Sequence, residues 1–162
     1  MKTQKMMTKI LISLISLSFI FLQGFKSLPE SQVIVQKDNR IIIDTDAELM
    51  DISREEAIEL MGIATNEAGN QGIVGMALVM RVVLNRLEHG EYGDSIHDVI
   101  FADGQFATAG MPRSGFSLEC ETALMCVLWG WDESQGALYF CAEGYNGPIP
   151  LFRYRGHWFS KK

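Results

Sequence analysis

The length, composition and charge of the chain limit the classes of protein to which it can belong. Its 162 residues are enough for a single domain with a substantial hydrophobic core. The formal net charge is −6 at pH 7, which argues against a nucleic-acid-binding role because the phosphate backbone favours a basic protein face. No segment repeats at a fixed period, and none is of low complexity.

Residues 1–24 have the pattern of a secretory signal peptide. Three lysines, at positions 2, 5 and 9, precede an apolar stretch over residues 10–22. The cleavage site that follows is weak, and an uncleaved anchor is therefore the alternative interpretation. The sequence predicts a secreted protein that would touch a membrane only through this segment, if the segment were retained.

Residues 25–52 are predicted to be a spacer that contains a short hairpin. Two apolar triplets, at 33–35 and 41–43, flank a polar turn at residues 37–40. A disordered linker is the competing interpretation of this composition. The main domain is predicted to occupy residues 53–162.

The first helix of the main domain is predicted to begin after Ser53 and to end near Glu67. Ser53 and Glu56 have the spacing of a capping box, and Gly69-Asn70 breaks the helical pattern. Apolar residues recur at the spacing of one buried helix face: Ala57, Ile58, Leu60, Met61 and Ala64. Glu67 is thereby placed on the last turn of this helix.

A second helix is predicted from Asn70, as its cap, to Leu87, with a stop at Gly90. Its stretch 73–84 is apolar on almost every face, which is typical of a helix in the middle of a core. The stretch is shorter than the roughly 20 apolar residues of a membrane span. Glu67, directly before this helix, is expected to be partly desolvated, and desolvation favours the protonated form of a carboxyl. Glu67 is therefore a candidate proton donor.

The remaining elements are predicted to be two helices and a small β portion. The helices begin after the capping residues Ser95 and Ser117. One strand is predicted at residues 136–140, and a second at 152–159, where aromatic residues surround basic ones. The β portion thus lies near the C-terminus.

Five residues with polar or reactive side chains are interpreted as structural. Asn85 and Arg86 end the buried helix, where the asparagine would bond to a neighbouring loop. Cys120 and Cys126 lie on nearly opposite faces of a predicted helix and should not pair with each other. Cys141 could bridge to either of them, although three buried thiols are the preferred interpretation.

Several short motifs occur in a characteristic order. Residues 66–71 read Asn-Glu-Ala-Gly-Asn-Gln and residues 82–86 read Val-Val-Leu-Asn-Arg. Three later motifs are Gly-Gln-Phe, Ala-Leu-Tyr-Phe and Gly-His-Trp-Phe, at residues 104–106, 137–140 and 156–159. Together they resemble the SleB/CwlJ-like cell-wall hydrolases, which include enzymes that cut spore-cortex peptidoglycan. The chain departs from the family's Ala-Glu-Ala-Arg-Gly-Glu at Gly69-Asn70, in place of Arg-Gly, and at Gln71, in place of the second Glu.

The resemblance implies a fold, an activity and a site. The fold would be α+β and mostly helical, a lysozyme-like domain with a small β portion near the C-terminus. The activity would be cleavage of the MurNAc–GlcNAc glycosidic bond in peptidoglycan, without a cofactor, by a monomer that is secreted or cell-wall associated. Glu67 matches the family's catalytic glutamate, and Gln71, Gln105, Phe106 and Tyr139 are assigned to substrate binding. For Tyr139, stacking on a sugar and burial in the core remain equal alternatives. Spore-cortex lysis in germination is one biological role that the family suggests.

The number of carboxylate groups at the site distinguishes the possible mechanisms of glycosidic-bond cleavage. Glycosidases generally use two carboxylates, whereas the chain has Gln71 where the family has its second glutamate. A lytic transglycosylase needs only one acid, and Glu67 alone favours this type. A hydrolytic muramidase that uses a loop aspartate is the alternative, and a non-catalytic peptidoglycan-binding protein is another. The loop aspartates are Asp94, Asp98 and Asp103. The histidines lack the spacing of a metal site, and His157 is interpreted as structural rather than as a base.

Overall fold

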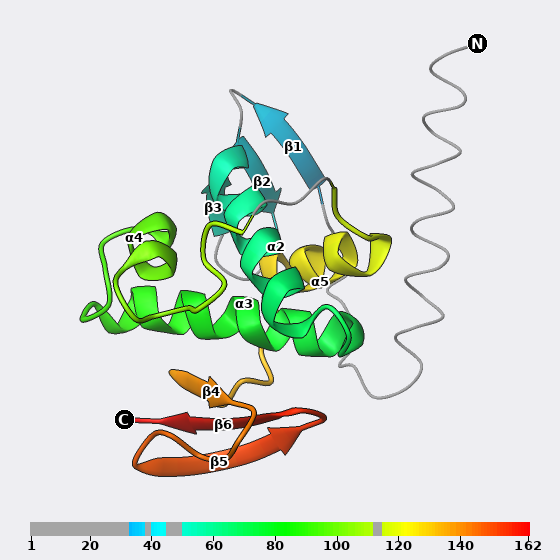
Figure 1. Cartoon of the computed structure of the whole chain (residues 1–162). Coiled ribbons are helices and arrows are strands. Elements are labelled where there is room, and N and C mark those ends of the chain that lie inside the picture. Colours follow the sequence, from blue (N-terminus) through cyan, green and yellow to red (C-terminus); the bar gives the residue numbers. More distant parts are fainter. Residues whose placement is uncertain (1–32, 38–39, 45–49, 112–114) are drawn as a thin grey trace. The chain divides into compact units, whose positions relative to one another are not determined.

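A computed structural model describes residues 33–37, 40–44, 50–111 and 115–162 of the chain. Residues 33–162 form one compact unit (Figure 1). The predicted signal peptide lies outside the described residues. Among the residues that are described, no helix is long and apolar enough to cross a membrane.

The described residues form four helices and two small antiparallel sheets. The helices are α2 (Arg54–Ala68), α3 (Gly72–His89), α4 (Ile96–Phe101) and α5 (Leu118–Leu128). The first sheet has the order β1-β2-β3 and contains Val33–Lys37, Arg40–Asp44 and Met50–Ser53. The second has the order β4-β6-β5 and contains Tyr139–Cys141, Ile149–Tyr154 and His157–Lys161. This confirms a mostly helical α+β fold with a small β portion near the C-terminus.

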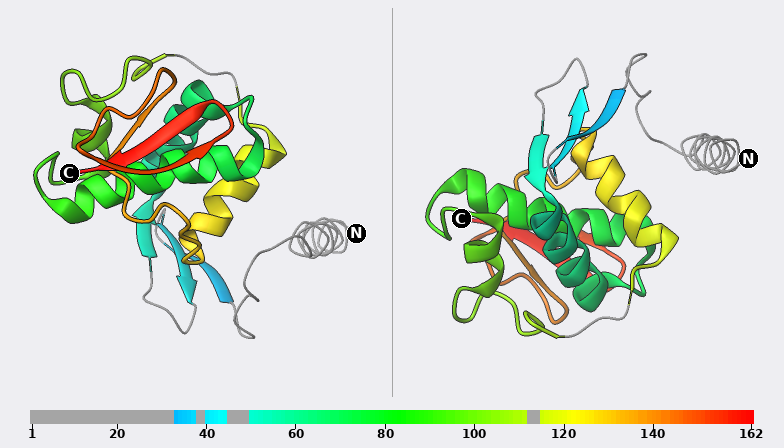
Figure 2. Two further views of the ribbon diagram at one scale, coloured as in Figure 1. Left: turned by 90° about the horizontal axis from the view of Figure 1, so that it is seen from below. Right: turned by 90° about the horizontal axis from the view of Figure 1, so that it is seen from above.

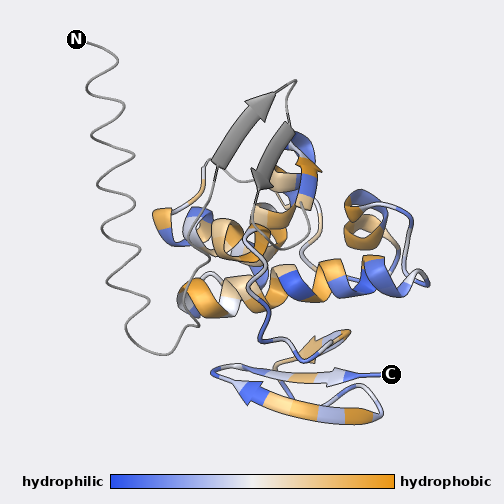
Figure 3. Cartoon of the chain, turned by 180° about the vertical axis from the view of Figure 1, so that it is seen from behind, coloured by the Kyte–Doolittle hydropathy of each residue, from blue (hydrophilic) through white to orange (hydrophobic). Residues whose placement is uncertain are grey.

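Helix α3 is the central element of the compact unit. Figure 1 shows α2, α4 and α5 on one side of it and the sheet β4–β6 on the other, and the left view of Figure 2 shows the sheet lying across it. All residues of α3 from Gly75 to Arg86 are buried, as the apolar stretch predicts. Hydrophobic residues predominate along most of this helix, and hydrophilic ones toward its C-terminal end (Figure 3). Gly90 ends the helix in a left-handed conformation, with φ of 75°, which confirms the predicted stop.

The structure confirms the predicted cap of α2 but not the predicted cap of α3. The Ser53 hydroxyl accepts a hydrogen bond from the Glu56 backbone at 3.1 Å, and the Glu56 carboxylate accepts one from the Ser53 backbone at 2.8 Å. This confirms the predicted start of α2. The assignment of Asn70 as the cap of the next helix is wrong. Asn70 is exposed, and α3 begins at Gly72 with Gln71 in the cap position, because Gly72 adopts a φ of 71° that turns the chain into the helix.

Two buried polar side chains at the end of α3 hold the loop that leads into β4. The Asn85 amide donates hydrogen bonds of 2.9 Å to the Ser134 hydroxyl and to the carbonyl of Ala137. The Arg86 Nε donates one of 2.7 Å to the carbonyl of Leu138. These bonds satisfy loop carbonyls that would otherwise be buried without partners. The structural interpretation of Asn85 and Arg86 is therefore confirmed.

The single strand predicted at residues 152–159 is in fact two strands. β5 and β6 pair antiparallel, with Tyr154 opposite His157, so the chain reverses at Arg155-Gly156. Phe159 on β6 is fully buried, and it packs against Leu78 and Val82 of α3. The hairpin therefore places one face on the helix and leaves the other outward.

The N-terminal strands belong to the same compact unit as the helices. β1 and β2 are antiparallel, with Lys37 opposite Arg40, which is the hairpin that the two apolar triplets predict. β2 also pairs with β3, and α2 follows β3 directly. The compact unit thus begins at Val33, within the segment assigned to the spacer.

None of the three cysteines forms a disulfide bond in the structure. Cys120 and Cys126 are buried on α5, whereas Cys141 is half-buried on β4. Burial raises the pKa of Cys126 to about 11, because a low-dielectric environment disfavours the thiolate. The preferred interpretation of three buried thiols therefore holds for Cys120 and Cys126, whereas Cys141 is only partly buried.

Candidate active site

Glu67 lies on the last turn of α2, where the chain bends toward α3. Gly69 follows it and donates a backbone hydrogen bond of 3.0 Å to the carbonyl of Thr65. A Cβ atom at Gly69 would lie 2.5 Å from that carbonyl oxygen, so this tight turn requires glycine. Glu67 itself is half-buried rather than fully exposed. The break that marked the helix end in the sequence therefore also fixes the position of the acid.

Thr108 holds one oxygen of the Glu67 carboxylate. Its hydroxyl donates a short hydrogen bond of 2.5 Å to Oε1 of Glu67. The Asn66 amide donates a second bond, of 3.1 Å, to the backbone carbonyl of Thr108. The loop after Phe106 is thereby attached to the last turn of α2 at two points. This arrangement orients the carboxyl group through one of its two oxygens.

Replacing Thr108 with valine should lower the activity without unfolding the protein. Valine keeps the shape but removes the hydroxyl that orients Glu67. If Glu67 is the proton donor that the resemblance implies, we expect wall lysis to fall by about 10-fold, because a misplaced catalytic group is used less often. Thr108→Ser, which keeps the hydroxyl, should retain most of the activity. Turbidity loss of purified cell walls, together with the melting temperature, measures both effects. Equal activity of the valine and serine variants would contradict this role.

Gln71 and His157 form a buried pair that joins the α2–α3 turn to the start of β6. The Gln71 Nε2 lies 3.1 Å from Nδ1 and 3.3 Å from Nε2 of His157, and the two residues are 6% and 7% exposed. Burial lowers the pKa of His157, and the negative charge of Glu67 opposes this effect only in part. His157 is therefore a neutral imidazole at neutral pH, and it lies within the electrostatic field of Glu67.

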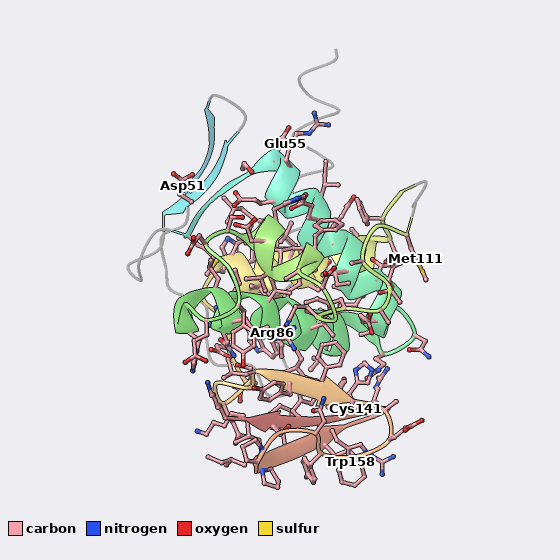
Figure 4. All side chains as sticks on the ribbon, turned by 60° about the vertical axis from the view of Figure 1, so that its left-hand side comes forward. Asp51, Glu55, Arg86, Met111, Cys141 and Trp158 are labelled. Carbon is pink, nitrogen blue, oxygen red and sulfur yellow. The ribbon has the colours of Figure 1, made fainter. Side chains whose placement is uncertain are left out.

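Two of the other predicted binding residues, Phe106 and Tyr139, lie around Arg86. The guanidinium of Arg86 lies 4.8 Å from the ring centre of Phe106, 5.4 Å from that of Tyr92 and 6.0 Å from that of Tyr139. The hydroxyl groups of the two tyrosines are 2.7 Å apart. Phe106 is 8% exposed, whereas Gln105 before it is half-buried. Figure 4 shows Arg86 between α3 and the C-terminal sheet.

A pocket of about 240 Å³ lies beside the last turns of α2. Asn66 and Thr108, which bond to each other, both line it. Much of the rest of its wall is apolar and comes from α2 and α4, as with Ile63 and Ile100. The pocket lies between α2, α4, residues 108–111 and Phe116.

Of the three loop aspartates, Asp98 has a structural role in the cap of a helix. Asp98 accepts a hydrogen bond of 2.7 Å from the Ser95 hydroxyl and is part of the cap of α4. Asp94 and Asp103 are exposed. Within the described ranges, no three histidine, cysteine, aspartate or glutamate side chains gather where they could hold a metal ion.

The structure thus brings together residues that are distant in the sequence. Thr108 is 41 positions from Glu67, and His157 is 86 positions from Gln71. The sequence interpretation did not identify Thr108, and it treated His157 only as a structural residue. The Gly-Gln-Phe motif, which ends two residues before Thr108, is the only signal that could have drawn attention to this loop.

Comparison with known proteins identifies the family. The model of the cell wall hydrolase family matches residues 70–159. The matched segment contains Gln71, Gln105 and His157, and it begins just after Glu67. No curated protein and no solved structure matches the chain. Because the match covers more than half of the chain, the protein belongs to the SleB/CwlJ-type family of cell wall hydrolases, whose substrate is peptidoglycan.

Proposed function

We propose that the protein cleaves the MurNAc–GlcNAc glycosidic bond of peptidoglycan as a lytic transglycosylase. The observation that carries this proposal is the placement of Glu67. Its carboxyl group is half-buried, and the Thr108 hydroxyl holds Oε1 at 2.5 Å. A carboxyl fixed through one oxygen presents the other in a defined direction, as a general acid requires.

One carboxyl group is sufficient for the whole reaction. The free oxygen of Glu67 donates its proton to the glycosidic oxygen, and the bond between that oxygen and C1 of the muramic acid breaks. The resulting carboxylate then takes the proton of the C6 hydroxyl of the same sugar, and the C6 oxygen bonds to C1. The product is a 1,6-anhydro ring, and Glu67 is protonated again. Because nucleophile and electrophile belong to one sugar, no water has to be positioned.

The surroundings of Glu67 support this single-acid route. Gln71 is an amide and cannot act as a base or as a carboxylate nucleophile. Its partner His157 is neutral, but it is buried against Gln71. Asp98 is engaged in the cap of α4. A muramidase would have to use one of the exposed loop aspartates, which would activate water from across the bound sugar.

The same proposal assigns the substrate contacts. Gln105 is half-buried, and its amide could donate to and accept from an N-acetyl or hydroxyl group. Gln71, Phe106 and Tyr139 would contribute further contacts to the glycan. The protein would act outside the cell, secreted or associated with the wall, where this substrate is located.

The chemical nature of the new ends tests the reaction type. We expect fragments released from purified walls to carry 1,6-anhydro-muramic ends, lighter by one water than hydrolysed fragments. Mass spectrometry of the soluble fragments measures this difference directly. A digest with a known muramidase provides the control for reducing ends. Ordinary reducing ends from the purified protein would overturn the transglycosylase assignment and leave a muramidase.

A further inference from the structure

The last part of the chain differs in charge from the rest of the protein. Residues 144–162 contain no aspartate or glutamate, although the whole chain has a net charge of −6. The same segment contains four basic residues: Arg153, Arg155, Lys161 and Lys162. Lys162 is paired with Glu91, whereas the two arginines are exposed on the β5–β6 hairpin. An acidic protein therefore carries one locally basic hairpin.

Arg155 has a backbone conformation that glycine would adopt more easily. It is the first residue of the two-residue loop between Tyr154 and His157, and its φ is 45°. Residues with a Cβ atom rarely adopt this left-handed conformation, and where they do the strain often accompanies a functional role. The hairpin thus keeps a long charged side chain where the backbone favours glycine.

The hairpin tip lies against the α2–α3 turn, which follows the proposed catalytic acid. A Cβ atom placed on Gly72 would lie 3.4 Å from Nη1 of Arg155. A Cβ atom placed on Gly156 would lie 3.4 Å from Nε2 of Gln71. Both contacts are made with the α2–α3 turn, which begins directly after Glu67 and Ala68. The Arg155 guanidinium therefore lies beside Gly72, the first residue of α3.

The two hairpin arginines contact aromatic rings, but no carboxylate among the described residues balances their charge. The Arg155 guanidinium lies 5.6 Å from the ring centre of Tyr154, and that of Arg153 lies 4.8 Å from the ring centre of Trp158. The Arg153 Nε also donates a hydrogen bond of 3.1 Å to the carbonyl of Arg155. In the part of the chain that the structure describes, neither arginine forms an ion pair with a carboxylate. Figure 4 shows Trp158 on the side of the small sheet that faces away from the helices.

We propose that Arg155, with Arg153 beside it, binds carboxylates of the peptide stems of peptidoglycan. This inference rests on the proposed function. The stem is attached to muramic acid, the sugar whose C1 bond is broken. Each reacting sugar therefore brings the carboxylates of its stem close to Glu67. The planar guanidinium group matches a carboxylate with two parallel hydrogen bonds. Arg155 is then a specificity-determining residue, and glycan strands that carry peptide stems are the preferred substrate.

Three substrates made from one preparation of walls test this preference. The first is purified peptidoglycan freed of phosphate-containing polymers, which removes phosphate as an alternative anion. The second is the same material after an amidase has removed the peptide stems and the lactyl carboxylates exposed by this hydrolysis have been converted to neutral amides. In the third, the stem carboxylates are converted to neutral amides while the peptides remain. We expect kcat/KM of the wild type to be about 10-fold higher on the first substrate than on the other two.

Matched variants separate binding from folding. Arg155→Gln should lose about 10-fold on the stem-bearing substrate and should cut the stripped glycan at the wild-type rate. Arg155→Gly should show the same loss with an unchanged or higher melting temperature, since glycine relieves the left-handed backbone. Arg155→Lys should retain part of the preference. The control is Arg54→Gln, the same change of charge at the opposite end of α2 from Glu67.

Two outcomes would overturn the inference while the proposed function stands. One is equal cleavage of all three substrates by the wild type. The other is an Arg155→Gln variant whose activity falls equally on stem-bearing and stripped glycan, because this would assign Arg155 to the glycan or to folding. Failure of the wild type to cut any of the substrates would overturn the proposed function as well.

Discussion

Replacing Glu67 with glutamine should lower wall lysis by at least about 100-fold, in line with the usual contribution of a general acid. Glutamine has the same shape as glutamate, and its carbonyl oxygen can still accept the bond from Thr108. The variant should therefore fold normally, but its side chain has no proton to give to the glycosidic oxygen. Turbidity loss of purified walls measures the activity, and thermal unfolding measures the fold.

The control for this experiment is Glu55→Gln. Glu55 is an exposed acid on the first turn of the same helix, so the variant has the same change of charge. Its stability should fall slightly, because an acid at the N-terminal end of a helix interacts favourably with the helix dipole. We expect it to lyse walls at close to the wild-type rate. If Glu67→Gln were nearly as active as this control, Glu67 could not be the proton donor. If its lysis and melting temperature fell together, the loss would belong to folding.

The sequence was sufficient to place Glu67 because the signals around it are local. The capping box at Ser53 sets the start of α2, and the Gly69 break sets its end. The apolar stretch that follows has no polar face, so α3 had to be the central helix. Each of these signals depends on residues within one or two helical turns. Local backbone chemistry and hydrophobic periodicity therefore predicted the element that carries the acid.

The partners of Glu67 could not be predicted in this way. The bond from Thr108 and the contact between Gln71 and His157 join segments that only the tertiary fold brings together. No periodic pattern encodes such contacts. The strand error at residues 152–159 has a related cause. The turn there begins with an arginine at positive φ, in a position where glycine or asparagine is the usual signal.

Phe106 and Tyr139 are the two aromatic residues of the matched motifs that were assigned to substrate binding. Phe106 is buried and Tyr139 is half-buried, and both lie around the guanidinium group of Arg86. An aromatic ring and an arginine can attract each other when the charge lies over the ring face. Arg86, assigned only a structural role from the sequence, thus connects the Gly-Gln-Phe loop, the end of α3 and β4. The motif residues owe part of their placement to this single side chain.

Replacing Arg86 with alanine should lower the free energy of unfolding by about 3 kcal/mol, within the usual range for truncating a large buried side chain. Arg86 is 5% exposed, and alanine would leave a cavity between the surrounding rings. The carbonyl of Leu138 would also lose its 2.7 Å hydrogen bond while it remains buried. Urea unfolding followed by tryptophan fluorescence measures the change.

Methionine at the same position should be much less destabilising than alanine. Burial lowers the pKa of Arg86, against the opposing effect of Tyr92 and Tyr139, so the folded state bears a cost for keeping this charge out of water. Among the described residues, no carboxylate pairs with Arg86, and its Nη1 has no hydrogen-bond partner. Removing the charge therefore leaves no opposite charge unpaired, unlike the breaking of a buried ion pair. Methionine fills most of the volume and loses mainly the bond to Leu138. If Arg86→Met were as unstable as Arg86→Ala, the polar interactions of the guanidinium group, with the aromatic rings and with the Leu138 carbonyl, would dominate, and the packing argument would fail.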